Sequence, residues 1–329
     1  GREGTYVLRY EGEGEINLAL DAEVISEKPG EIVFRHNSGT FEVQLTDTDP
    51  NDTGDYIRNI SIVKEEYVDL YDSGAIFNPE SLERLQDFRE FRTMAWQRTI
   101  ESPIETLDDL TRVDHSTYAT TSGVPIEVLV ALSNEAGTDL WLTIPTKAND
   151  EVVDYYAEYV RDNLDPNLKV TVEYGNELWN NGYQDTHDLR AEAVEVWGVS
   201  PEDQPAHSAY IAYKATLVAQ RFNAAFDKVE DGDKPLLHHT LGSQAARPAI
   251  TEYYLESEAW QINDPDSYVP VNETFDSIAI ATYFGGNTIT DDEERALLIE
   301  AINDPNVDAN EYLFNLLQDP EYEFSIPYT

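Results

Sequence analysis

The chain contains no cysteine among its 329 residues. Disulfides, thiolate zinc sites and cysteine nucleophiles are therefore excluded. It also lacks any apolar run near the roughly 18 residues that a membrane-spanning helix requires, so we expect no membrane insertion. Basic residues are scarce: 21 Lys and Arg stand against 65 Asp and Glu, a net charge of -44. This charge repels phosphate groups, which makes nucleic acid and anionic membranes poor partners.

The rest of the composition is that of a folded protein. Hydrophobic residues make up 41% of the chain, with 20 Tyr, 11 Phe and 5 Trp, whereas acidic disordered segments are poor in aromatic residues. The charges are spread through amphipathic segments instead of forming one acidic tail. Because salt screens repulsion between surface charges, we expect a protein that works in a saline environment.

The first 66 residues carry the period-two alternation of β-strands. Turns rich in Gly and Asp separate the runs. The expected strands cover residues 6–10, 15–20, 31–34, 40–45 and 56–63. Short alternating runs of this kind predict a small all-β module over residues 1–66, either β-sandwich-like or a curled sheet.

From Asn78 onwards, strand and helix patterns alternate. Asn78 as N-cap with Pro79 at the first helical position predicts a helix through about Phe88. Regular alternation of strands and helices is typical of parallel βα units. The expected strands are 91–96, 140–144, 170–174, 236–240 and 278–283; the expected helices are 126–136, 151–164, 207–229, 291–302 and 308–317.

The most informative segment is TVEYGNELWN, residues 171–180. An alternating strand leads into Asn176 and Glu177, and Trp179 follows. A carboxylate at the carboxyl end of a parallel strand stands where barrel enzymes hold their catalytic groups. Asn176 can hydrogen-bond a substrate hydroxyl, and Trp179 offers a face on which a sugar ring can stack. The alternative is that Asn176 and Glu177 only cap the next helix.

Together with FRTMAWQRT, LWLTIPTKAND, LLHHTLGSQ and FDSIAIATYFGG, this segment resembles a clan of secreted TIM-barrel glycoside hydrolases that place the acid/base Glu directly after an Asn on strand 4. The resemblance implies an α/β fold, with a (β/α)8 TIM-barrel-like domain over residues 67–329. The five strands above would be strands 2–6, and the β-module would be inserted between strands 1 and 2. Strand 1 would then precede Gly1, and strands 7 and 8, with the nucleophile Glu, would follow Thr329. The alternative is that another segment of the chain completes the sheet.

The resemblance also implies residue roles. Glu177 would be the acid/base of a retaining mechanism, which needs a second carboxyl group about 5–5.5 Å away. Glu173, four strand residues earlier, would lie roughly 13 Å away, so we expect it to pair with an Arg inside the barrel. Further substrate contacts are expected from Arg92, Trp96, Gln97, Trp179, His239 and Tyr283. For Arg92, a structural ion pair within the barrel is an equal alternative, and for the substrate contact on the fifth strand either His238 or His239 qualifies. No metal or cofactor is expected.

Two functions remain open. The first is an extracellular glycoside hydrolase that acts on a polysaccharide or oligosaccharide. The second is a non-catalytic extracellular protein, either a surface or a filament-forming structural protein, that reuses a glycosidase-like fold and self-associates through its β-module.

Raising NaCl from millimolar to molar concentration is expected to stabilise the protein, because screening weakens the repulsion among its acidic side chains. Each kcal/mol of stabilisation corresponds to a rise of about 2–4 °C in Tm for a domain of roughly 150–250 residues. Differential scanning calorimetry across a salt series measures the shift. A Tm that falls along the series would contradict the saline interpretation.

Overall fold

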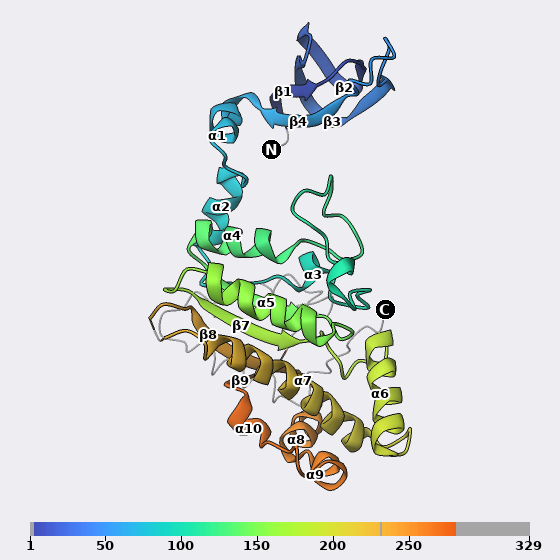
Figure 1. The fold of residues 1–329 in the computed structure, drawn as a ribbon, viewed down its shortest axis with the longest axis vertical. Coiled ribbons are helices and arrows are strands. Elements are labelled where there is room, and N and C mark those ends of the chain that lie inside the picture. The colour runs from blue at the N-terminus through green and yellow to red at the C-terminus, as the bar shows by residue number, and fades with distance from the viewer. Residues whose placement is uncertain (1–2, 231, 281–329) are drawn as a thin grey trace, which may run out of the picture. The chain divides into compact units, whose positions relative to one another are not determined.

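The computed structural model describes residues 3–230 and 232–280 (Figure 1). The chain has a mixed α/β fold and divides into two compact units between Arg84 and Leu85. The sequence pattern places this division earlier, after residue 66, because the alternating strands end there. In the structure, the short helices η1 (Glu65–Tyr67) and α1 (Val68–Asp72) pack on the strands of the first unit. The first unit therefore extends into the helical segment that follows the sheet.

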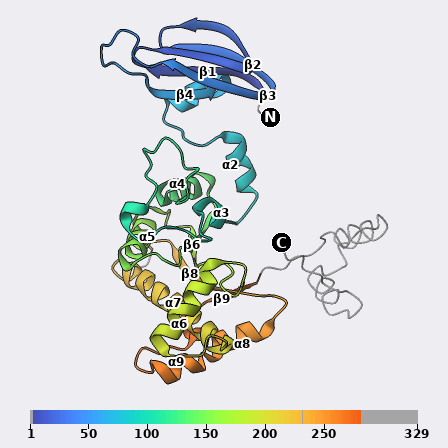
Figure 2. The same cartoon turned by 90° about the vertical axis from the view of Figure 1, so that its right-hand side faces the viewer.

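The first unit is built on one antiparallel sheet of four strands in the order β2-β3-β1-β4 (Figure 2). Its strands are β1 (Gly4–Glu11), β2 (Glu15–Lys28), β3 (Glu31–Asp47) and β4 (Arg58–Lys64). The strands expected at 31–34 and 40–45 are a single strand, β3. Its small core consists of Leu8, Ile16, Ile32 and Phe34. The described residues of this unit form this one sheet, and no second sheet is found among them.

The second unit contains a curled parallel sheet of five strands, whose spatial order is the same as their order in the chain. They are β5 (Glu90–Arg92), β6 (Asp139–Ile144), β7 (Lys169–Tyr174), β8 (Leu236–Ser243) and β9 (Ser277–Ile280). The parallel arrangement expected from the alternation of strands and helices is confirmed. The expected strand 91–96 is wrong beyond Arg92, because the chain turns into α3 (Met94–Gln97).

Capping residues mark where helices of the second unit begin or end. The helix α4 (Ile126–Ala136) has the expected bounds and ends at Gly137 in the left-handed conformation. The Asn149 side chain accepts the Val152 N–H and begins α5 (Asp150–Asn163). The other helices are α2 (Pro79–Gln86), which starts in the first unit, and η2 (Leu107–Asp109), α6 (Gln184–Trp197), α7 (Gln204–Phe226), α8 (Pro248–Glu256), α9 (Glu258–Asn263) and α10 (Val271–Thr274). The helices expected at 291–302 and 308–317 lie outside the described residues.

The parallel sheet has one apolar face and one polar face. On the apolar face, Leu142, Val172 and Leu241 are buried; α4 packs on β6, and α7 packs on β7 and β8 (Figure 1). The register of the strands places a polar set on the opposite face: Arg92, Trp141, Thr143, Thr171, Glu173, His238, Thr240 and Ser277. Parallel strands covered by helices on both faces read as continuous apolar runs. The alternation here therefore gives this sheet one polar surface.

His239 lies on the apolar face and not at the carboxyl end of the strand. It pairs in register with the buried Val172, and β8 continues to Ser243 beyond it. Its Nε2 is 3.0 Å from Oδ1 of Asn223 on α7, and the residue is buried. Burial lowers the pKa of His239 to about 4, against the partial opposition of the Asp276 charge. Because side chains alternate along a strand, it is His238 that faces the polar side, where its Nε2 lies 2.9 Å from the Ser277 hydroxyl.

The buried His239 is expected to make stability depend on pH between about 6.5 and 4. In the unfolded chain the imidazole takes up its proton near pH 6.5, whereas in the folded protein it does so only near pH 4. Stability therefore falls as the pH decreases through this window, by up to about 3 kcal/mol from this group. Urea unfolding of wild type and His239→Gln at pH 7, 5.5 and 4.5 measures it. The stability advantage of wild type over the variant should shrink towards acid pH; a constant advantage would contradict the assignment.

Candidate functional site

The chain turns sharply where β7 ends at the carboxyl edge of the parallel sheet. Gly175 has a φ of 64°, and a Cβ at this position would lie 2.7 Å from the Leu178 side chain. Its N–H donates to the Ile144 carbonyl on the neighbouring strand at 2.8 Å. Glu177 is also left-handed, with a φ of 47°, which costs a residue with a Cβ about 1–2 kcal/mol. The backbone strain of this turn is thus concentrated at the residue expected to act as acid/base.

Glu177 is half-buried, and its surroundings hold the carboxylate in place. Its Oε2 accepts a hydrogen bond from Nδ2 of Asn180 at 3.0 Å, and its carbonyl accepts the Asn180 N–H at 2.7 Å. Burial raises the pKa of the Tyr183 phenol, and the nearby charges of Glu177 and Glu101 raise it further. Because β7 stops at Tyr174 and the chain then turns, the straight-strand separation of roughly 13 Å between Glu173 and Glu177 does not apply.

The capping alternative for Asn176 and Glu177 is wrong. The next helix, α6, begins at Gln184, several residues after the pair, and its N-cap residue is Tyr183. The N–H of Gln184 donates to Oε1 of Glu101, at 2.9 Å. Neither Asn176 nor Glu177 is needed to satisfy the start of this helix.

Arg92 is the centre of a polar cluster on the polar face of the sheet. Its Nε donates to Oε2 of Glu173 at 2.8 Å, and its Nη2 donates to Oδ1 of Asn176 at 2.9 Å. Trp141 completes the cluster: its Nε1 donates to the same Glu173 oxygen at 2.9 Å, and the guanidinium carbon lies 5.4 Å from its ring centroid. The expected pairing of Glu173 with an Arg is confirmed.

The contact with Arg92 fixes the orientation of the Asn176 amide. A guanidinium can only donate hydrogen bonds, so the Asn176 atom that faces Arg92 must be the oxygen. Its amide nitrogen has no hydrogen-bond partner in the described part of the chain, and it carries two donors. The residue is itself 5% exposed. Asn176 is therefore held in place through its acceptor oxygen.

The Glu173 carboxylate is buried, at 4% exposure. Burial raises the pKa of Glu173 above its ordinary value, and the Glu177 charge adds to this effect; Arg92 and the Trp141 N–H oppose it. Room for the carboxylate comes from Gly242 on β8, because a Cβ there would lie 2.8 Å from Oε1 of Glu173. Gly242 was not among the expected site residues, although a glycine inside a strand signals a close approach.

A second buried carboxylate, Asp185, ties the loops at this edge together. It is 1% exposed. Its two oxygens accept the Glu101 N–H at 2.7 Å and the Thr146 hydroxyl at 2.8 Å. These contacts join the loops after β5 and β6 to the first turn of α6, which supports the segment that follows Glu177. Nothing in the sequence distinguishes Asp185 from the many solvated acids around it.

The other expected contact residues are dispersed. Trp96, on α3, is 47% exposed, and Trp179 is partly buried against the core. Gln97 is buried at 4% exposure and bridges the backbone N–H and carbonyl of Thr143, each at 3.0 Å, so its amide serves the fold instead of a sugar subsite. Tyr283 lies outside the described residues.

Residues 3–230 and 232–280 contain neither a metal-type cluster of side chains nor a membrane-spanning helix. No group of three or more His, Cys, Asp or Glu side chains is arranged to hold a metal ion there. No helix in the same ranges is long and apolar enough to cross a membrane.

Comparison with known proteins adds no assignment: no family model, curated protein or solved structure matches the chain.

Replacing Arg92 by Met is expected to destabilise the protein by about 3 kcal/mol at neutral pH, because it leaves the Glu173 carboxylate buried without its cation. This is the lower end of the range for buried pairs, since the Arg92 side chain is 33% exposed. The loss should be smaller at acid pH, where Glu173 becomes protonated. Denaturant unfolding of Arg92→Met, Glu173→Gln and the double variant at pH 8 and pH 5 measures the coupling. Additive effects of the two substitutions at pH 8 would show that the pair is not coupled.

Proposed function

We propose that this protein is a glycoside hydrolase-like protein that acts on a polysaccharide, with Glu177 as the general acid/base. In this proposal the curled parallel sheet represents strands 2–6 of a (β/α)8 barrel, and its polar face lines the barrel interior. The observation that carries the proposal is the hydrogen bond from Arg92 to Asn176, since it holds the amide by its oxygen, so that its two N–H donors are the groups that would meet a sugar hydroxyl beside Glu177. The TVEYGNELWN segment carries the resemblance from which glycoside hydrolysis is inferred.

The geometry gives each residue of the Asn–Glu pair a separate task. Asn176 donates hydrogen bonds to a sugar hydroxyl while Arg92 holds its oxygen. Glu177 gives a proton to the leaving glycosidic oxygen and then removes one from the incoming water, a role that contributes typically 10²–10⁴-fold to rate. Asn180 donates to the carboxylate and keeps it oriented. Proton transfer depends on holding the carboxyl group in the correct position relative to the glycosidic oxygen.

Glu173 is assigned to positioning and not to nucleophilic attack. One of its oxygens accepts hydrogen bonds from both Arg92 and Trp141, and the other lies against Gly242. A carboxylate held by these contacts is not free to attack the anomeric carbon of a sugar. A retaining mechanism requires a second carboxylate about 5–5.5 Å from the acid/base, and Glu173 does not supply it.

The setting proposed for this activity is extracellular or at the cell surface, in a saline environment. The net charge of -44 favours a protein that screening salt keeps compact. The exposed Trp96 offers an aromatic face of the type on which sugar rings stack.

A non-catalytic, self-associating protein is the second candidate, and one observation favours it. The strand β2 forms an edge of the antiparallel sheet and exposes Leu20 at 73%, Val24 at 46% and Ile25 at 52%. A long edge strand with exposed apolar side chains is a template for pairing with another chain. This candidate predicts binding of carbohydrate or of a second copy without any hydrolysis.

Replacing Glu177 by Gln is expected to reduce polysaccharide hydrolysis at least about 100-fold, because the amide cannot transfer the proton. Binding of the polysaccharide should persist, since the Asn176 contact and the shape of the site remain. Release of reducing ends and affinity electrophoresis on the same polysaccharides measure the two effects. Glu252→Gln, which removes an exposed carboxylate on α8, is the matched control and should behave like wild type.

Hydrolysis by Glu177→Gln at the wild-type rate would overturn the acid/base assignment. Wild type that binds polysaccharide without cleaving any would favour the non-catalytic candidate instead.

A further inference from the structure

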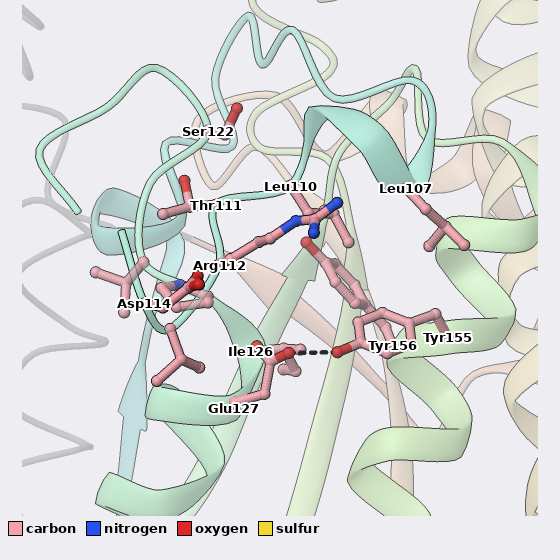
Figure 3. Close-up of a pocket in the computed structure, with 13 residues that line it drawn as sticks. Leu107, Leu110, Thr111, Arg112, Asp114, Ser122, Ile126, Glu127, Tyr155 and Tyr156 are labelled. Atoms are coloured by element: carbon pink, nitrogen blue, oxygen red, sulfur yellow. Dashed lines mark hydrogen bonds between the residues drawn. The ribbon is translucent and has the colours of Figure 1, made fainter. Parts of the chain in front are cut away.

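A cavity of about 520 Å³ lies apart from the polar cluster around Arg92, between the loop that contains η2 and the first turns of α4 and α5 (Figure 3). Its volume is in the range of small-molecule sites, roughly 300–1,000 Å³. Its apolar lining comes from Leu107, Leu110, Val124, Ile126 and the rings of Tyr155 and Tyr156. None of these residues takes part in the chemistry proposed for Glu177.

Two hydrogen-bond donors converge on this cavity. Figure 3 shows the Arg112 side chain extending across it towards Tyr156. The Arg112 residue is exposed, and its guanidinium has no ion pair or hydrogen bond within the described part of the chain. The Tyr156 hydroxyl also lacks a hydrogen-bond partner among those residues, while the side chain as a whole is 5% exposed. A guanidinium and a phenol that share a cavity offer N–H and O–H groups to one acceptor.

Two acidic residues, Glu127 and Asp114, also line the cavity. Glu127 accepts the hydroxyl hydrogen bond of Tyr155, which occupies part of its acceptor capacity (Figure 3). Asp114 is exposed, and its carboxylate is more than 4.0 Å from the Arg112 nitrogens, since no ion pair joins them. Ser122 adds one more hydroxyl to the lining. The cavity thus combines a ring-lined wall, two converging donors and a polar rim.

We propose that this cavity binds a small organic carboxylate, specifically a sugar acid of the uronate type. The carboxylate accepts hydrogen bonds from Arg112 and Tyr156, which is the strong, charge-assisted kind of contact. The pyranose ring lies against the tyrosine wall, and Ser122 and Asp114 face its hydroxyl groups. Recognition of the carboxylate stands independently of hydrolysis at Glu177; the choice of a sugar acid rests on the proposed action on polysaccharide.

Isothermal titration with D-glucuronate and D-glucose, at one fixed NaCl concentration, tests the proposal on the full chain. Wild type should bind glucuronate at least about tenfold more tightly than glucose, because charged hydrogen bonds are lost with the neutral sugar. Arg112→Gln should weaken glucuronate binding at least about tenfold, and Tyr156→Phe should weaken it several-fold. Arg84→Gln removes an exposed positive charge on α2 and should leave it unchanged.

Equal affinity for the two sugars, no binding of glucuronate by wild type, or full affinity in Arg112→Gln would each overturn the proposal. Glu177→Gln separates this cavity from the proposed catalytic site, because it should retain glucuronate binding while losing hydrolysis. Loss of glucuronate binding in Glu177→Gln would place the carboxylate site at Glu177 and also overturn the proposal.

Discussion

The ion pair between Arg92 and Glu173 is the interaction on which the candidate site depends. It joins β5 to β7 across β6, and Trp141 on the strand between them donates to the same carboxylate. An ion pair on a sheet face needs further hydrogen bonds to offset the loss of hydration. Those bonds are supplied by Trp141 and Asn176, so the stability of the sheet and the orientation of the Asn–Glu turn rest on one set of contacts.

The two faces of the parallel sheet explain why such a cluster can exist at all. Helices cover the face that carries Leu142, Val172 and Leu241, and the hydrophobic core forms there. The opposite face is free to carry charge, because folding does not require it to be apolar. A site with charged and hydrogen-bonding groups can then be built without disturbing the core, in keeping with the general separation of scaffold and site in α/β folds.

Much of this fold follows from local patterns in the sequence. The bounds of α4 and the order of the five parallel strands are as expected from alternation, because buried β-branched runs and helical periodicity leave little ambiguity. The errors arise where tertiary contacts decide. The strand expected at 236–240 continues in β8 through Gly242, which makes room for Glu173. The sequence predicts His239 near the end of its strand. In the structure it lies on the apolar face of the sheet, where it contacts Asn223 on α7. The contacts of Arg92 join residues 81 and 84 positions apart, which no local pattern specifies.

The left-handed backbone at Glu177 has an evolutionary consequence. Glycine and asparagine adopt that conformation with less strain than glutamate, and each is reached from a glutamate by few nucleotide changes. A lineage under no selection for a carboxylate at this turn would drift towards the residues that relax it. Persistence of an acidic side chain at the equivalent turn in diverging descendants would therefore record selection acting on the carboxylate itself, separately from selection on folding.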